Sequence, residues 1–446
     1  MTKIQLSRGR LAAFVSPHIP LAALGLPLVV NLPPFYASEM GLGLVAVSQV
    51  FFFARLWDVF LDLGFGFVSD QMQWKWGRRK PWILIGLPIL LFTIYRLFLP
   101  SGQVSELELF ATLFIFYIGW TFVILSHYAW SSEISDDYDG RSKVQGWIQL
   151  ATVGGMTLVL TLTAYVESIG GTRFDQMRTM GLFGLVLLPV TCIAAVSLMG
   201  EPAPDHRPSL SIKLALTALR RNKPLRFVIA ADLLVNLTAG LIGSTFIFFA
   251  RYYLELGTQA SALLFVYFLA GVFGIPVWTR IALRFGKRQC FVLHSIFNLV
   301  TLPLLFLIPH NNFGIAAVIF AIVGTNYGTA SIVLRAMMSD VIDVDRLDTG
   351  QDRSGLYFAL LTLTAKLGLA APLIVFYPIL SYIGFQAQGR NSPEAIAGLA
   401  YIYILSPCLF AILGIWLMRR FPIDAAAQAQ MRAEITKRTA ARLRRL

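Results

Sequence analysis

Long apolar blocks separated by short polar connections run along almost the whole chain, for example at 84–99, 109–125 and 297–308. A helix needs about 20 mostly apolar residues to cross a bilayer, so the blocks predict membrane spans. A backbone in lipid must satisfy its own hydrogen bonds, and the blocks are too long for barrel strands, so the spans are expected to be helices. The pattern predicts twelve, near residues 12–35, 44–69, 82–99, 108–130, 144–166, 179–199, 227–250, 259–281, 290–309, 315–337, 356–383 and 397–418.

The composition agrees with a membrane protein. Of 446 residues, 57% are hydrophobic and 14% are charged, whereas soluble domains carry about 25% charged residues. The net charge of +13 does not indicate a nucleic-acid partner, because the basic residues lie between apolar blocks rather than on one water-exposed face. Cys192, Cys290 and Cys408 lie far apart without ligand spacing and are expected to be small buried residues.

The basic residues predict the orientation of the chain. If the N-terminus is cytoplasmic, thirty Lys and Arg residues lie on the cytoplasmic side and four on the other, with Arg55, Arg96 and Lys366 inside spans. Cytoplasmic loops carry the excess of basic residues in membrane proteins. The asymmetry predicts a multi-pass protein with both termini in the cytoplasm. The expected location is a bacterial inner membrane.

A basic, Pro-containing connection divides the spans six and six. Trp76-Gly77-Arg78-Arg79 after the second span and Phe285-Gly286-Lys287-Arg288 after the eighth lie 209 residues apart, which indicates a weak internal repeat. Two related halves are typical of a transporter whose substrate site lies between them. The predicted parts are an N-terminal half at 1–200, a cytoplasmic loop at 201–226, a C-terminal half at 227–418 and a basic cytoplasmic tail at 419–446. Residues 424–446 form either a helix on anionic lipid or a solvated tail.

Charged residues inside the spans are the strongest functional signal. At 100° per residue, Arg55, Asp58 and Asp62 fall within about 60° of one another on the second span, with Asp58 near mid-depth. Lys366 reaches a comparable depth in the eleventh span. Each charge costs about 2.5–3.5 kcal/mol at a helix centre. The four charges are therefore expected to pair with one another or to line a wet cavity.

Two interpretations of these charges stay open. They form a salt-bridged cluster that holds helices in register, or Asp58 and Asp62 bind a coupling cation. Two carboxylates one turn apart can present oxygens to Na⁺ or hold one shared proton. Arg55 and Lys366 would then be charge partners that hold the carboxylates when no cation is bound. Filling the site changes the local charge by one unit, which can bias the side on which a transporter opens.

Other polar positions carry weaker signals. Residues 70–82 form a charged cytoplasmic turn, either a lipid anchor or a gate that contains Asp70, Arg78 and Arg79 and whose basic residues pair with acids near 133–139 or 340–345. Asn236 and Asn326, like Asp232, His294 and Asn298, line a solute cavity or form interhelical hydrogen bonds.

One extended motif is specific. It reads Arg55-x-x-Asp58-x-x-x-Asp62-x-x-x-Gly66-x-x-Ser69-Asp70, continued by Trp76-Gly77-Arg78-Arg79-Lys80-Pro81-Trp82, with Asp340-Val-Ile-Asp343, Thr349-Gly350-x-x-Arg353 and Arg141 elsewhere. These segments resemble the melibiose-permease family, the glycoside–pentoside–hexuronide:cation symporters of the major facilitator superfamily. The likeness extends over essentially the whole chain.

The resemblance implies an all-α membrane protein of twelve helices in two six-helix halves, alternating access, and a cation site at Asp58 and Asp62 with Lys366 nearby. It also adds Arg141, Asp340, Asp343 and Arg353 to the candidate cytoplasmic gate. Sugar-transporting members carry sugar-binding carboxylates at positions that fall near Ala22 and near Ser126, ahead of Trp130. Neither position is acidic here, which argues against a galactoside.

The sequence therefore predicts a cation-coupled secondary transporter, a Na⁺ or H⁺ symporter of a small organic solute such as a sugar or glycoside. An uncoupled facilitator, or a transporter of a lysolipid-like solute, is the alternative. A membrane enzyme or a scaffold is a remote one, since the chain has no HExxH, GxSxG or Cys/His cluster. The expected partners are the solute, a monovalent cation and the bilayer, with no cofactor, no structural metal and no nucleic acid, for a protein acting as a monomer.

Overall fold

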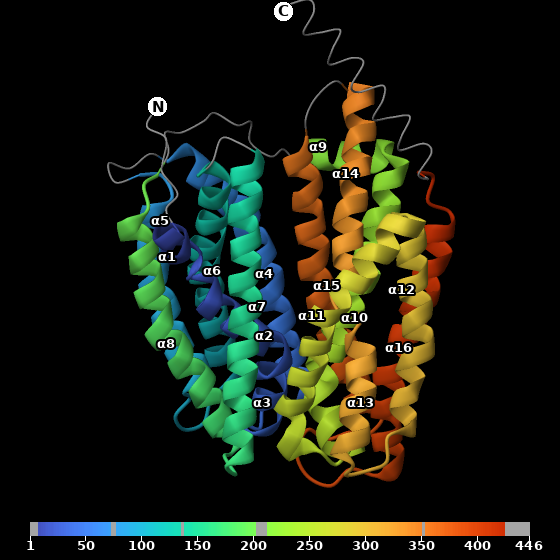
Figure 1. The fold of residues 1–446 in the computed structure, drawn as a ribbon. Coiled ribbons are helices and arrows are strands. Elements are labelled where there is room, and N and C mark those ends of the chain that lie inside the picture. Colours follow the sequence, from blue (N-terminus) through green and yellow to red (C-terminus); the bar gives the residue numbers. More distant parts are fainter. Residues whose placement is uncertain (1–7, 73–76, 135–137, 202–211, 350–352, 424–446) are drawn as a thin grey trace, which may run out of the picture. The chain divides into compact units, whose positions relative to one another are not determined.

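The computed structural model describes residues 8–72, 77–134, 138–201, 212–349 and 353–423, and every regular element in these ranges is helical (Figure 1). Within them, twelve segments are long and apolar enough to cross a membrane. These segments match the twelve predicted spans one for one. Cys192, Cys290 and Cys408 are buried and free, as expected.

The first six spans are built from eight helices, because the first span is broken. The helices are α1 (Arg8–Val15), α2 (His18–Val30), α3 (Leu32–Ser38), α4 (Leu44–Gln71), α5 (Lys80–Phe98), α6 (Glu106–Glu133), α7 (Tyr138–Ser168) and α8 (Arg173–Leu198).

The remaining spans follow a short helix, α9 (Ile212–Arg221), and include short π and 3-10 segments. They comprise α10 (Lys223–Phe248) with η1 (Phe249–Tyr253), η2 (Gly257–Gln259) with α11 (Ala260–Phe285), α12 (Lys287–Thr301) with η3 (Leu302–Leu307), α13 (Phe313–Gly324) with α14 (Thr329–Thr349), α15 (Ser354–Tyr382) and α16 (Pro393–Arg419).

The breaks in the spans have local causes. Pro17 has no N–H to donate to the carbonyl of Ala13, so the helix ends and the Ser16 hydroxyl donates to that carbonyl instead at 2.9 Å. The tenth span, expected to be continuous over 315–337, is interrupted between α13 and α14, where Gly328 adopts a positive φ of 77°. Such a backbone conformation favours glycine.

Small residues let neighbouring helices approach closely, as is common inside membranes. A Cβ on Gly86 of α5 would lie 2.9 Å from the carbonyl oxygen of Gly119 on α6. A Cβ on Gly240 of α10 would lie 2.8 Å from the Cα of Leu369 on α15. Larger residues at these positions would push the helices apart, so the glycines fix which helices are neighbours.

The chain forms two compact units. Unit 1 contains residues 1–209, 243–265 and 373–399, and unit 2 contains residues 210–242, 266–372 and 400–446. Unit 1 thus includes two segments that follow residue 226 in the sequence. The core of unit 2 is built from α10, α12, α14 and α15, with Tyr357, Met337 and Met338 among its buried side chains.

Candidate cation site and polar clusters

Arg55, Asp58 and Asp62 of α4 lie where the helix packs against α6. Asp58 is fully buried and Asp62 half-buried. Arg55 Nη1 lies 3.5 Å from Asp58 Oδ2. The opposite face of α4 exposes Phe53 and Phe60, as expected of a face toward lipid. The expected single polar face is confirmed for these charged residues.

A threonine on α6 joins the two carboxylates. The Thr121 hydroxyl lies 2.9 Å from Asp62 Oδ1 and 3.4 Å from Asp58 Oδ1, and it is fully buried. A hydroxyl has one hydrogen to donate, so it serves one carboxylate at a time. Both carboxylates therefore converge on one point between α4 and α6. We call Arg55, Asp58, Asp62 and Thr121 the α4–α6 cluster.

Aromatic side chains of α6 form the walls of this cluster. The Arg55 guanidinium lies 5.1 Å from the centre of the Tyr117 ring, and Trp57 stacks on Phe114 with ring centres 4.1 Å apart. A cation over an aromatic face is attracted by the ring's quadrupole. Tyr117 therefore helps to hold Arg55 beside the carboxylates.

The α4–α6 cluster presents only oxygen atoms as ligands. Carboxylate and hydroxyl oxygens suit hard cations rather than soft metals, and two nearby carboxylates can also share a proton. Among the described residues, no group of three or more His, Cys, Asp or Glu side chains is arranged to hold a metal ion. Lys366, the fourth predicted charge, is half-buried on α15 in unit 2.

The residues predicted for a solute cavity occupy different settings. Ala22 is half-buried on α2, and Ser126 is fully buried, with no hydrogen bond to its hydroxyl from the described residues. Trp130 Nε1 donates to the carbonyl of Gly200 at 3.3 Å. The Asn236 amide donates to the Asp232 carbonyl of its own helix at 2.8 Å.

Asn326 belongs to a network between α12 and the break after α13. Its Nδ2 donates to the Asn298 side chain at 2.8 Å and to the His294 carbonyl at 3.1 Å, and its Oδ1 lies 2.7 Å from His294 Nδ1. Asn326 thus makes the hydrogen bonds to α12 that the interhelical interpretation expects, and its role in a solute cavity stays a prediction. Elsewhere in unit 2, α10 and α15 are joined by the Thr364 hydroxyl, which donates to Asp232 Oδ2 at 2.8 Å.

The basic residues of the two repeated loops bind the ends of other helices. Arg79 Nη1 donates to the Ser69 hydroxyl at 3.2 Å, and its backbone N–H donates to the Glu201 carboxylate. In the second loop, Lys287 Nζ lies 2.7 Å from both oxygens of Asp340, while Arg288 donates to the Met418 carbonyl at 2.9 Å.

The remaining gate candidates are placed as follows. Arg353 lies 3.9 Å from Asp345, and Arg78 and Asp343 are half-buried. The side chains of Asp70 and Arg141 lie outside the part of the structure that is described. The gate therefore stays a prediction.

A family model described as MFS/sugar transport protein matches residues 13–425. The chain belongs to this family. It is 23% identical over 413 residues to a glucuronide carrier protein homolog of Escherichia coli strain K12, covering 91% of this chain and 90% of that protein. It is 24% identical to the putative glycoside/cation symporter YagG of the same strain, covering 91% and 90%.

More distant matches extend the comparison. The sodium-dependent lysophosphatidylcholine symporter 1 of Mus musculus is 22% identical, with 86% of this chain and 79% of that protein covered. Among solved structures, the nucleoside transporter NupG superposes with a TM-score of 0.67, at 13% identity, over 94% of this chain and 100% of that one. This MFS protein is thus a multi-pass membrane transporter and not an enzyme.

The transporter also contains a buried histidine pair that the sequence analysis did not single out. His127 Nε2 lies 2.7 Å from the Phe14 carbonyl, and its Nδ1 lies 3.0 Å from His18 Nε2. A carbonyl only accepts, so Nε2 of His127 carries a hydrogen, and in the neutral imidazole Nδ1 then accepts from His18. The break at Pro17 was the available signal, because a helix that ends there leaves its last carbonyls, including that of Phe14, without partners in the helix.

Proposed function

We propose that this transporter is a cation-coupled symporter that moves a small organic solute together with Na⁺ or H⁺ by alternating access. The observation that carries the proposal is the convergence of Asp58 and Asp62 on Thr121 inside the protein. The names of the relatives, a glycoside/cation symporter and a sodium-dependent symporter, support it.

Competition between a cation and Arg55 provides the coupling. At 3.5 Å the contact between Arg55 and Asp58 is at the long end for a hydrogen bond, so a cation entering between the carboxylates can replace it. The cluster then gains one positive charge, and Arg55 is released toward Tyr117. Lys366 is the second charge partner in this proposal.

The proposal keeps the organisation that the sequence predicts. Its halves at 1–200 and 227–418 move around a solute site between them, with the loop at 201–226, the tail at 419–446 and both termini in the cytoplasm. Asp70, Arg78, Arg79, Arg141, Asp340, Asp343 and Arg353 form the cytoplasmic gate. The protein acts as a monomer in a bacterial inner membrane.

A sugar or glycoside is the proposed solute class, supported by the family description and by the glycoside relatives. Ala22, Ser126, Trp130, Asn236 and Asn326 remain the candidate contacts. The lysophosphatidylcholine relative supports a lysolipid-like solute as the alternative. Thermal-shift titration with methyl glycosides and with lysophosphatidylcholine separates the two classes, because a ligand that binds the native state raises its apparent stability.

Ion-dependent melting of the purified protein tests the cation site. In NaCl or LiCl, against choline chloride, the melting temperature should rise, since an ion at 100 times its Kd stabilises by about 2.7 kcal/mol. For proton coupling the rise appears instead on lowering pH without Na⁺. The Asp58→Asn/Asp62→Asn double variant should lose the response, while Glu106→Gln, at an exposed carboxylate, should keep it.

Two results would contradict symport. A double variant that melts with the wild-type ion response would remove the carboxylates from the mechanism. A protein that equilibrates solute in proteoliposomes but never accumulates it under an imposed Na⁺ or proton gradient would be a facilitator.

A further inference from the structure

A second charged network in unit 1 involves five residues that the cation site does not use. It consists of Glu39, Glu167, Arg173, Arg251 and Ser261, and we call it the outer network. The first three residues precede the loop at 201–226, and the last two follow it. The predicted orientation places this network on the external side.

A buried carboxylate caps a helix in this network. Glu167, near the end of α7, has a side chain that is 2% exposed. The backbone N–H of Ser261 donates to its two oxygens at 2.9 and 3.2 Å, and the Ser261 hydroxyl donates at 2.9 Å. Ser261 is the second residue of α11, whose first-turn N–H groups have no partner within the helix. Hydrogen bonds to a carboxylate at this end are charge-assisted and are also favoured by the helix dipole.

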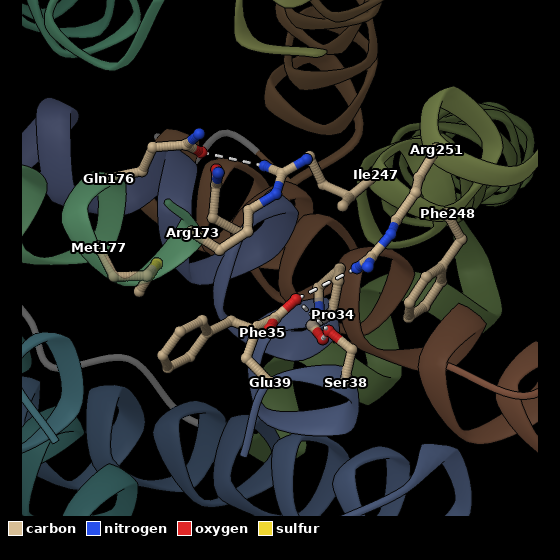
Figure 2. A pocket seen from close by; sticks show the side chains of 11 residues that line it. Pro34, Phe35, Ser38, Glu39, Arg173, Gln176, Met177, Ile247, Phe248 and Arg251 are labelled. Atoms are coloured by element: carbon tan, nitrogen blue, oxygen red, sulfur yellow. Dashed lines mark hydrogen bonds and ion pairs between the residues drawn. The ribbon is translucent and has the colours of Figure 1, made fainter. Parts of the chain in front are cut away.

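Arg173 adds a second connection to the same short segment. Its Nη2 donates to the Gly257 carbonyl at 3.1 Å, its Nη1 donates to Gln176 at 3.0 Å, and Glu167 lies 3.9 Å away. Figure 2 shows Arg173 directed toward Gln176. A capping box of Thr172 and Asp175 fixes the start of α8, which carries Arg173.

The third connection is more exposed. Arg251 Nη1 lies 3.1 Å from the Glu39 carboxylate, with side chains 42% and 20% exposed (Figure 2). Exposed ion pairs contribute little because water screens them. The stability of the outer network is therefore concentrated in the buried contact between Glu167 and Ser261.

We infer that the outer network is a latch, in which the Glu167 carboxylate seals the external side by capping α11 and is released when that side opens. Although both residues lie in unit 1, Glu167 belongs to the proposed half at 1–200 and Ser261 to the half at 227–418. Halves that rock against each other must separate the contacts between their ends once in each cycle. A capped helix end suits this role, since water can replace the carboxylate at the N–H groups. The inference rests on the alternating access in the proposed function, and not on its cation site.

Cysteine accessibility tests the latch. Ser38 lines the pocket beside Glu39 and Arg251 and is buried, so Ser38→Cys reports opening (Figure 2). The purified protein, in choline buffer without solute, is labelled with a charged maleimide, and the parent with its three buried cysteines gives the background. Glu167→Gln should label at least about tenfold faster, Ser261→Ala about threefold faster because the N–H remains, and Arg251→Gln less than about twofold faster.

The comparison between variants decides the outcome. Glu167→Gln labelling no faster than Arg251→Gln, in protein that melts as the parent does, would overturn the latch. If Glu167→Gln does not fold, Ser261→Ala decides: labelling at the parental rate would overturn it. Since no Na⁺ or solute is present, the latch stands or fails independently of the ion response of Asp58 and Asp62.

Discussion

The α4–α6 cluster of unit 1 and the polar contacts of unit 2 both place polar side chains inside membrane-spanning helices, but they arrange these side chains differently. In unit 1, two carboxylates and a guanidinium lie around one hydroxyl, that of Thr121. In unit 2, the Asp232 carboxylate accepts a hydrogen bond from the Thr364 hydroxyl, which it does not share with a second carboxylate in the contacts described. The first arrangement gathers charge at one point, whereas the second joins two helices.

The difference separates binding from packing. An added cation changes the balance of the α4–α6 cluster, because two negative charges and one positive charge lie within a few ångströms of one another. The neutral network of Asn298, Asn326 and His294 has no such imbalance, and its members satisfy one another. In the proposed function, the unbalanced charge of the α4–α6 cluster is therefore the site that a cation visits, whereas matched polar groups such as those of Asn298, Asn326 and His294 hold helices in register.

The largest expected effect is that of Asp58→Asn. The change removes one of the two negative charges and breaks the ion pair between Arg55 and Asp58. Cation affinity should fall more than about 100-fold, and the free energy of unfolding should fall by about 3 kcal/mol, as for other broken buried pairs. Melting curves in NaCl and choline chloride measure both.

Asp62→Asn is the matched comparison for Asp58→Asn. Asp62 is half-buried whereas Asp58 is fully buried, so water screens the charge of Asp62 more and the stability loss should be smaller. Equal losses of stability in the two variants would show that the contact between Arg55 and Asp58 has no special weight.

How far the sequence predicts these features depends on their distance along the chain. Arg55, Asp58 and Asp62 lie within eight residues, so helical periodicity alone places them on one face. Thr121 is an uncharged residue 59 positions from Asp62, and neither composition nor spacing distinguishes it from other threonines in apolar spans. The contact between Glu167 and Ser261 joins residues 94 positions apart, so it could not be predicted from the sequence either. Twelve spans could be counted from the sequence, but the partners of each polar face could not.

Helix breaks show the same limit. The first span was expected to be continuous over 12–35, although the missing N–H of Pro17 is a sequence signal for the end of α1. The interruption between α13 and α14 falls in an apolar stretch predicted as one span, where Gly328 alone gives a weak signal. Whether a glycine bends a helix or lets a neighbour approach depends on packing, which the sequence does not contain.

Thr121→Val is expected to have an intermediate effect. Valine keeps the shape of the side chain but removes the hydroxyl shared by the two carboxylates. Hydrogen bonds to charged groups contribute about 1.5–3 kcal/mol, so cation affinity should fall about 10- to 100-fold. Titration of the melting temperature with NaCl measures the change. Thr121→Ser, which retains the hydroxyl, should stay within about threefold of the wild type, and a loss as large as that of valine would assign the effect to packing.

Asp232→Asn should have the smallest effect. It tests whether the Asp232 carboxylate of unit 2 is only a structural contact, in contrast to the carboxylates of the α4–α6 cluster. Asparagine retains an oxygen that can accept from Thr364, and the lost charge assistance is offset by the lower cost of burying a neutral group. The free energy of unfolding should change by less than about 1 kcal/mol, near the average of interhelical hydrogen bonds in membranes. Cation affinity, measured by the same titration, should stay within about twofold of the wild type. A loss of ion response like that of Asp58→Asn would show that the carboxylate of unit 2 also binds the cation, and the distinction between a visited site and a structural contact would no longer hold.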